Sequence, residues 1–321
     1  MNIDIAKLDS DGVCRYMQVG KIELPEFWIT EYTGSKDKTI TLHHTIRDVD
    51  KFVDAHSQEM IREFNKFWKQ QQGLIKAAAV KESLRTFAVD PDLQAALTAN
   101  LNEFTEQVFK PMYTDLVAVA GKQQAQLITN AINKPLGFDI TNPRIVEIIN
   151  SEALSLASGL NTQQTLSIRG VLNEAIEQGW GSIKTARFMY DSVPLSARDS
   201  KALLNYRNRL LEQGGRTKGQ IDAMTRTYQK KLIRRRAKTI SRTELHRAKN
   251  QAQLEGTQQA IDAGYVKRAW KIWRTSLDDR VRDQHIQLES ERVELNQTFS
   301  NGSMYPDDIN ERCWIEEVLE V

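Results

Sequence analysis

Four residues that could take part in chemistry lie close together near the end of the chain: Asp278, Arg280, Arg282 and His285. An aspartate, an arginine and a histidine that converge can serve a nuclease or a metal site. The set holds a single histidine, however, and neither an H-E-x-x-H nor a C-x-x-C motif accompanies it. We therefore interpret these residues as a structural network and predict no catalytic residue. The alternative is a metal-dependent nuclease or hydrolase that uses Asp278, Arg282 and His285.

The spacing of these residues suits a short, capped helix. If a helix begins at Asp278 or Asp279, Arg282 and His285 are three residues apart and share a face with the capping carboxylate. In this interpretation Asp278 is the cap, and Arg280 or Arg282 pairs with Glu244.

Positive charge is concentrated just before this segment. Between Arg216 and Lys249 there are twelve lysine and arginine residues and two acidic ones, whereas residues 276–321 hold twelve acidic residues and four arginines. The densest run consists of Lys230, Lys231, Arg234, Arg235, Arg236 and Lys238. Because the run lacks the interleaved aromatic residues that stack on bases, we predict sequence-independent contact with the phosphates of DNA or another polyanion. The alternatives are an acidic partner protein and simple solvation, since the six residues are spread evenly around a helix.

The rest of the chain must position these residues, and its periodicity is mainly helical. Residues 1–50 favour extended segments broken by turn residues, which predicts an irregular or β arm. Apolar residues then recur at three- and four-residue steps, which predicts an α-helical body over 51–263 that ends in the long basic helix. Strand and turn signals follow in 264–321. The predicted fold is a mainly α-helical body with a small C-terminal α+β module.

Proline and glycine predict where individual elements begin and end. Pro111 should end or kink the helix that precedes it, and Pro143 should open the next one. Gly159 suits a left-handed stop before a further helix. Strands are predicted around 266–273 and 292–295.

Composition excludes several classes of protein. No apolar run approaches the ~18 residues of a membrane span, and no basic segment followed by an apolar one marks a secretory signal at the N-terminus. Only Cys14 and Cys313 occur, far apart in sequence, so a disulfide framework is not expected and a reducing compartment is the simpler interpretation.

Five motifs follow one another in the second half of the chain. They are I-x-R-T-E-x-x-R-A-x-N at 240–250, a tryptophan at 270, D-x-R-V-R-x-x-H at 278–285, F-x-N-G-x-x-Y-P-x-D at 299–308 and R-C-W at 312–314. This order and spacing resembles the Mu F-like family of tailed-phage minor head (head-morphogenesis) proteins. The resemblance covers roughly Phe138 to Trp314.

The resemblance implies a non-enzymatic protein of the phage head, made in the host cytoplasm and then placed in the head interior near the portal. Its implied partners are the portal protein, the major capsid or scaffold protein, and genomic DNA. Its implied role is in procapsid assembly, with genome packaging or ejection as further possibilities. No cofactor is predicted.

The resemblance also bears on the terminal residues. It places Glu244 against the terminal module, in a network with Arg242, Asp278, Arg280, Arg282 and His285. Many relatives carry C-R-C near the end, where two thiolates and the histidine could hold zinc. Here the triplet is Glu311-Arg312-Cys313, so the first cysteine is absent. We therefore predict no metal site, with His285 and Cys313 as weak candidates only.

Overall fold

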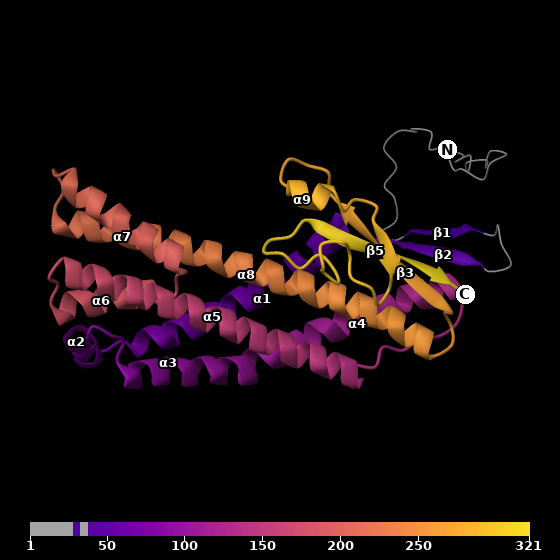
Figure 1. Cartoon of the computed structure of the whole chain (residues 1–321), viewed down its shortest axis with the longest axis horizontal. Coiled ribbons are helices and arrows are strands. Elements are labelled where there is room, and N and C mark those ends of the chain that lie inside the picture. Colours follow the sequence, from indigo (N-terminus) through magenta and orange to yellow (C-terminus); the bar gives the residue numbers. More distant parts are fainter. Residues whose placement is uncertain (1–27, 33–37) are drawn as a thin grey trace.

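The computed structural model describes residues 28–32 and 38–321, and most of this part of the chain is helical. The helices form an elongated body, and the strands gather at one end of it, at the right of Figure 1. The body contains α1 (Ile46–Gly73), α2 (Ala77–Thr86), α3 (Pro91–Phe104), α4 (Lys110–Ile132), α5 (Pro143–Glu177), α6 (Ser182–Ser192), α7 (Ala197–Glu212) and α8 (Lys218–Asp262). The sheet contains β1 (Trp28–Tyr32), β2 (Thr39–His43), β3 (Arg268–Thr275), β4 (Arg292–Glu294) and β5 (Cys313–Glu320), with the short helix α9 (Asp283–Ile286) between β3 and β4.

Polar side chains fix where the helices of the body begin. A side-chain oxygen at the residue before the helix accepts a backbone N–H of the first turn, which satisfies a donor that has no partner within the helix. This cap is made by Thr45, Asp90, Asn142, Ser196 and Thr217. The predicted start at Pro143 is confirmed.

The predicted stop at Gly159 is wrong, because α5 runs from Pro143 to Glu177 without a break. Its buried residues, from Ile145 through Leu160 to Ala175, form one continuous stripe, so burial favours a single long helix. Gly159 lies on the exposed side of this helix. Its low helix propensity costs about 1 kcal/mol, which the packing of the stripe outweighs.

Pro111 does not end the helical path that precedes it. A π-helical turn, Thr105–Phe109, joins α3 directly to α4, and Pro111 lies in the first turn of α4. A proline cannot donate to the carbonyl four residues earlier and its ring clashes with that group. The π-turn changes the hydrogen-bond register at this point, so the helical path continues past the proline.

The long basic helix, α8, is also the central helix of the molecule. None of residues 241–260 is exposed, and small side chains such as Ala248 and Ala252 let α1 and α4 approach it closely. Aromatic residues of α1 and α3 complete this core, with Phe67 stacked on Phe104.

The sheet has the strand order β1-β2-β5-β3-β4, with every pair antiparallel. β5 is its middle strand, so strands from both ends of the described chain pair with it: Thr39 opposite Glu320 on one side and Thr275 opposite Cys313 on the other. The predicted helical body with a small α+β module is confirmed. The sequence did not predict that β2 completes the sheet of the module, and the division at residues 50 and 263 stays a prediction.

One of the two tryptophans of β3, Trp273, lies in the core of the module, in edge-to-face contact with Phe299. The other, Trp270, is half-buried beneath Arg268 and Arg292. Among the helices of the described residues, none is long and apolar enough to cross a membrane.

Candidate functional site

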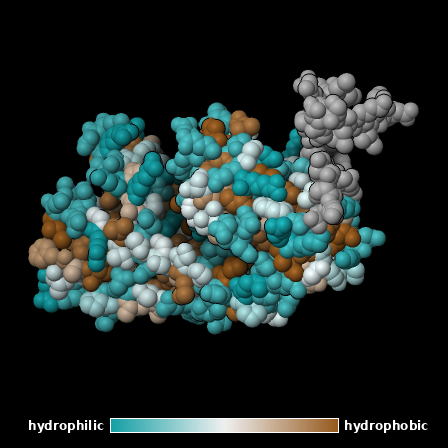
Figure 2. Space-filling view, turned by 45° about the vertical axis from the view of Figure 1, so that its right-hand side comes forward, coloured by the Kyte–Doolittle hydropathy of each residue, from teal (hydrophilic) through white to brown (hydrophobic). Residues whose placement is uncertain are grey.

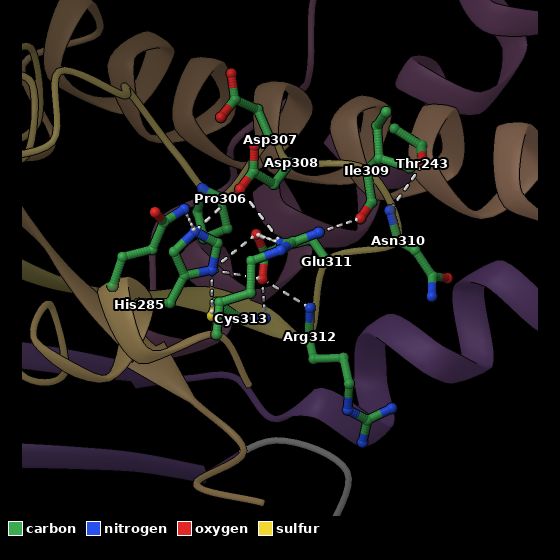
Figure 3. A network of polar contacts seen from close by, with 12 residues as sticks. Thr243, His285, Pro306, Asp307, Asp308, Ile309, Asn310, Glu311, Arg312 and Cys313 are labelled. Carbon is green, nitrogen blue, oxygen red and sulfur yellow. Dashed lines mark hydrogen bonds and ion pairs between the residues drawn. The ribbon is translucent and has the colours of Figure 1, made fainter. Parts of the chain in front are cut away.

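A histidine, a carboxylate and a thiol meet in a buried cluster at one end of β5. His285 lies in α9, Glu311 just before β5, and Cys313 at its first residue. His285 Nδ1 is 3.2 Å from Glu311 Oε2 and 3.8 Å from Cys313 Sγ. Figure 3 shows the three side chains pointing toward one another. Each is at most 3% exposed, so water screens their interactions only weakly.

A second carboxylate and an arginine complete this cluster. Asp308 Oδ2 is 3.1 Å from His285 Nε2, on the side of the ring away from Cys313. Arg282 lies 3.3 Å from Asp308 and 3.6 Å from Glu311, and it donates a 2.7 Å hydrogen bond to the carbonyl of Ile309. Arg282 and His285 therefore belong to one network, and their acidic partners in it are Asp308 and Glu311.

The cluster is held by groups whose own positions are fixed. Glu311 Oε1 accepts the backbone N–H of Arg312 at 2.8 Å and that of Cys313 at 3.1 Å. His246 of α8 hydrogen-bonds through Nε2 to the carbonyl of Cys313 at 2.8 Å. The ring of Trp273 meets that of His285 edge-on, with centroids 5.6 Å apart.

Asp278 lies outside the cluster. Its carboxylate pairs with Arg280 at 2.7 Å and Arg312 at 3.0 Å, and the hydrogen bond from Arg280 lowers its pKa to about 2. It does not cap a helix either, because α9 begins at Asp283 and residues 278–281 form a turn. In the described part of the chain, no hydrogen bond or ion pair joins Asp278 to His285, so the trio required by the nuclease alternative is not assembled.

Glu244 does not pair with Arg280 or Arg282, which corrects the sequence prediction. It is buried in α8, and its ion pair is with Arg247 of the same helix at 3.5 Å. Burial raises its pKa to about 7. Arg242, the remaining residue of the predicted network, points to the body and binds Asp50 of α1 at 2.8 Å.

The joint between α8 and the terminal module is made by hydrogen bonds to the backbone of the loop before β5. Arg247 donates to the carbonyl of Asp307, and Asn250 donates to the carbonyl of Pro306 at 3.2 Å. Thr243 accepts the backbone N–H of Asn310 at 3.0 Å. The motif at 240–250 therefore fixes the loop that carries Asp308 and Glu311.

The basic run of α8 is divided by burial. Lys230, Lys231, Arg234, Arg235 and Lys238 are exposed on the side of α8 that faces solvent. They are not spread evenly around the helix, because residues at i, i+4 and i+8 share a face.

Two arginines of this run have partners within the protein. Arg235, although exposed, binds Asp199 of α7 at 2.5 Å. Arg236 is buried over the ring of Trp68, with its guanidinium 5.3 Å from the ring centroid. Burial lowers the pKa of Arg236 to about 10. Direct contact of Arg236 with DNA is therefore wrong as a prediction.

The five sequence motifs, and the contacts of α8 with the loop before β5, lie within one region that matches a protein-family model. Residues 167–316 match the family model described as Phage Mu protein F like protein. This part of the chain, a little under half of its length, is similar to Mu F-like phage proteins. The family points to phage head morphogenesis and to a protein of the virion. No curated protein and no solved structure gives a significant match to the chain.

Two residues of the cluster around His285, Glu311 and Asp308, were not identified from the sequence. At position 311 the sequence was interpreted only as lacking the first cysteine of C-R-C. A glutamate two residues before Cys313 is itself a possible ligand. Asp308 ends the F-x-N-G-x-x-Y-P-x-D motif, but nothing in the sequence indicated that this loop folds back onto α9. Cys14, the other cysteine, lies outside the described residues.

Proposed function

We propose that this Mu F-like protein is a minor component of the phage head that associates with the portal and with the major capsid or scaffold protein during procapsid assembly. It lies in the head interior near the portal, after synthesis in the host cytoplasm. There it contacts genomic DNA without regard to sequence and acts in packaging or ejection. The family match at residues 167–316 carries the proposed place in the head. The exposed basic side of α8, which lies within these residues, supports the contact with DNA.

The neighbouring helix extends this basic surface. Arg198, Lys201 and Arg209 of α7 are exposed, and α7 packs along the first half of α8. In Figure 2 the upper left of the molecule, where α7 ends and α8 begins in Figure 1, is mainly hydrophilic. Exposed lysine and arginine side chains favour contact with phosphates, which carries no sequence information.

Quantitative protein composition of purified proheads and virions tests the assignment. We expect this chain in a few copies per particle and cross-linked to the portal protein. Proheads that lack the portal should contain much less of it. Particles that assemble with the portal but contain none of this chain would refute the proposal.

We also propose that the protein acts as a structural component and not as an enzyme. Asp278 is bound by two arginines, and the groups around His285 are tied to one another rather than open to a substrate. Incubation of the purified protein with supercoiled plasmid in Mg²⁺ or Mn²⁺ should leave the plasmid intact. Nicking that is lost in His285→Ala would favour the metal-dependent nuclease.

A further inference from the structure

We propose that His285, Glu311 and Cys313 bind one divalent transition-metal ion of borderline softness, such as Zn²⁺. This inference does not depend on the role in the phage head, because it concerns the folded chain alone. The three side chains offer a nitrogen, an oxygen and a sulfur ligand, the set that zinc accepts in mixed sites.

The distances between the donor atoms suit a tetrahedral centre. Bonds of about 2.0–2.3 Å from a central ion place neighbouring ligand atoms roughly 3.3–3.8 Å apart. His285 Nδ1 is 3.2 Å from Glu311 Oε2 and 3.8 Å from Cys313 Sγ. All three donor atoms lie within 4.8 Å of one another. An ion therefore requires only small movements of side chains that already converge.

The surroundings leave the required atoms available. Two backbone amides bind Oε1 of Glu311, whereas its Oε2 is buried and has no hydrogen-bond partner. With the ring proton on Nε2, which lies 3.1 Å from Asp308, the lone pair of Nδ1 faces the carboxylate of Glu311. Two facing lone pairs repel each other unless a positive species lies between them.

That species is either a proton or a metal ion, and Cys313 supplies a third ligand atom to a metal. Its sulfur lies beside the same Nδ1 atom and is fully buried, where a thiolate needs a cation for its charge. With Cys313 ionised, Glu311 and Cys313 together balance the charge of a divalent ion. Arg282, 3.6 Å from Glu311, opposes the ion and should keep the affinity below that of an all-cysteine site.

The full-length protein, freed of metal by a chelator, is titrated with Co²⁺ and separately with Zn²⁺. We expect binding of about one Co²⁺ per chain, with the thiolate-to-cobalt absorption band of a tetrahedral site. Zn²⁺ should displace the cobalt and raise the Tm. Cys313→Ser should abolish the band, whereas Cys14→Ser should retain it.

Two matched substitutions of neighbouring aspartates test how His285 is oriented without removing a metal ligand. Asp308→Asn should weaken metal binding by about 10–100-fold, because the ring of His285 loses the partner that orients it. Asp307→Asn makes the same change of charge one residue away and should have little effect. An equal effect of the two substitutions would show that Asp308 acts only through its charge and would overturn this part of the inference. If the wild-type protein gives no cobalt band and retains no zinc while folded, the metal site does not exist and the cluster holds a proton.

Discussion

Gln124 of α4 donates a 2.5 Å hydrogen bond to the carboxylate of Glu317 in the middle strand of the sheet. Glu317 is fully buried, and Gln253 and Thr257 of α8 also contribute hydrogen bonds to its carboxylate. Burial is the largest effect and raises the pKa of Glu317 to about 8. The central helix and the sheet therefore meet at a carboxyl group that is mostly protonated at neutral pH.

Replacing Glu317 with glutamine should reduce the pH dependence of stability. Because the folded pKa is above the unfolded value, the contribution of this group is fully present below about pH 4.5 and is lost as pH rises through about 8. Between pH 5 and 8 the Tm of the wild type should fall relative to that of Glu317→Gln. If the free energy of unfolding of the wild type falls by at least ~1 kcal/mol relative to Glu317→Gln, its Tm should fall by roughly 2–4 °C. Parallel Tm curves for the two proteins would contradict the assignment.

Removing exposed charge from α8 should weaken DNA binding and its dependence on salt. In the variant with glutamine at 230, 231, 234 and 238, we expect the negative slope of log K against log [salt] to become shallower by up to ~4. The change should be equal for unrelated DNA sequences. Arg236 is left unchanged because it is buried over Trp68. The control replaces four exposed lysines elsewhere in the body: Lys69, Lys76, Lys81 and Lys122. Equal losses in the two variants would assign the effect to net charge instead of to this surface.

The joint should depend on Asn250 more than on Asp278. Asn250→Ala leaves the carbonyl of Pro306 without its buried donor, at a cost of about 1–3 kcal/mol. Asp278→Ala breaks partly exposed ion pairs, which water screens, and should destabilise the protein less than Asn250→Ala does. Urea denaturation of the two variants measures both costs, and the reverse order would show that the pairs of Asp278 hold the module.

Gly121 allows α4 to pass under the ring of Phe138. A Cβ at residue 121 would overlap that ring, so Gly121→Ala should destabilise the protein by about 1–3 kcal/mol. In a Phe138→Ala background the same substitution should instead stabilise by up to ~1 kcal/mol, because alanine favours the helix. A double-mutant cycle of thermal unfolding checks this, and additive effects would rule out the contact.

Periodicity predicted the helices well wherever a helix has one buried side. It could not place α8 in the centre of the molecule. The second half of α8 is enclosed on all sides, so its sequence mixes small and polar residues such as Ala252, Gln253 and Asn250 without an apolar face. The predicted helix end at Gly159 was wrong because the continuous buried stripe of α5 outweighs the low helix propensity of one glycine.

The candidate site was predicted in part. Arg282 and His285 were identified from their spacing, because residues three positions apart lie on the same side of a helical turn. Their partners Asp308 and Glu311 are more than 20 residues away, and their approach depends on a loop that α8 holds through backbone groups. Contacts to backbone carbonyls leave little trace in residue type, so this joint was misread as an ion pair of Glu244.

The place of β5 between β2 and β3 has a consequence for the order of folding. Pairing of Thr39 with Glu320 closes a loop that contains nearly the whole described chain, and loop-closure entropy opposes such contacts until other structure shortens the distance. The hairpin-like contacts of β3 with β4 and the packing of α4 on α8 are available earlier. We therefore expect β2 to join the sheet late, with hydrogen-exchange protection at Ile40 and Leu42 appearing after that of α4 and α8. Until then one side of β5 is an unpaired edge, and refolding at high protein concentration should favour aggregation through that edge.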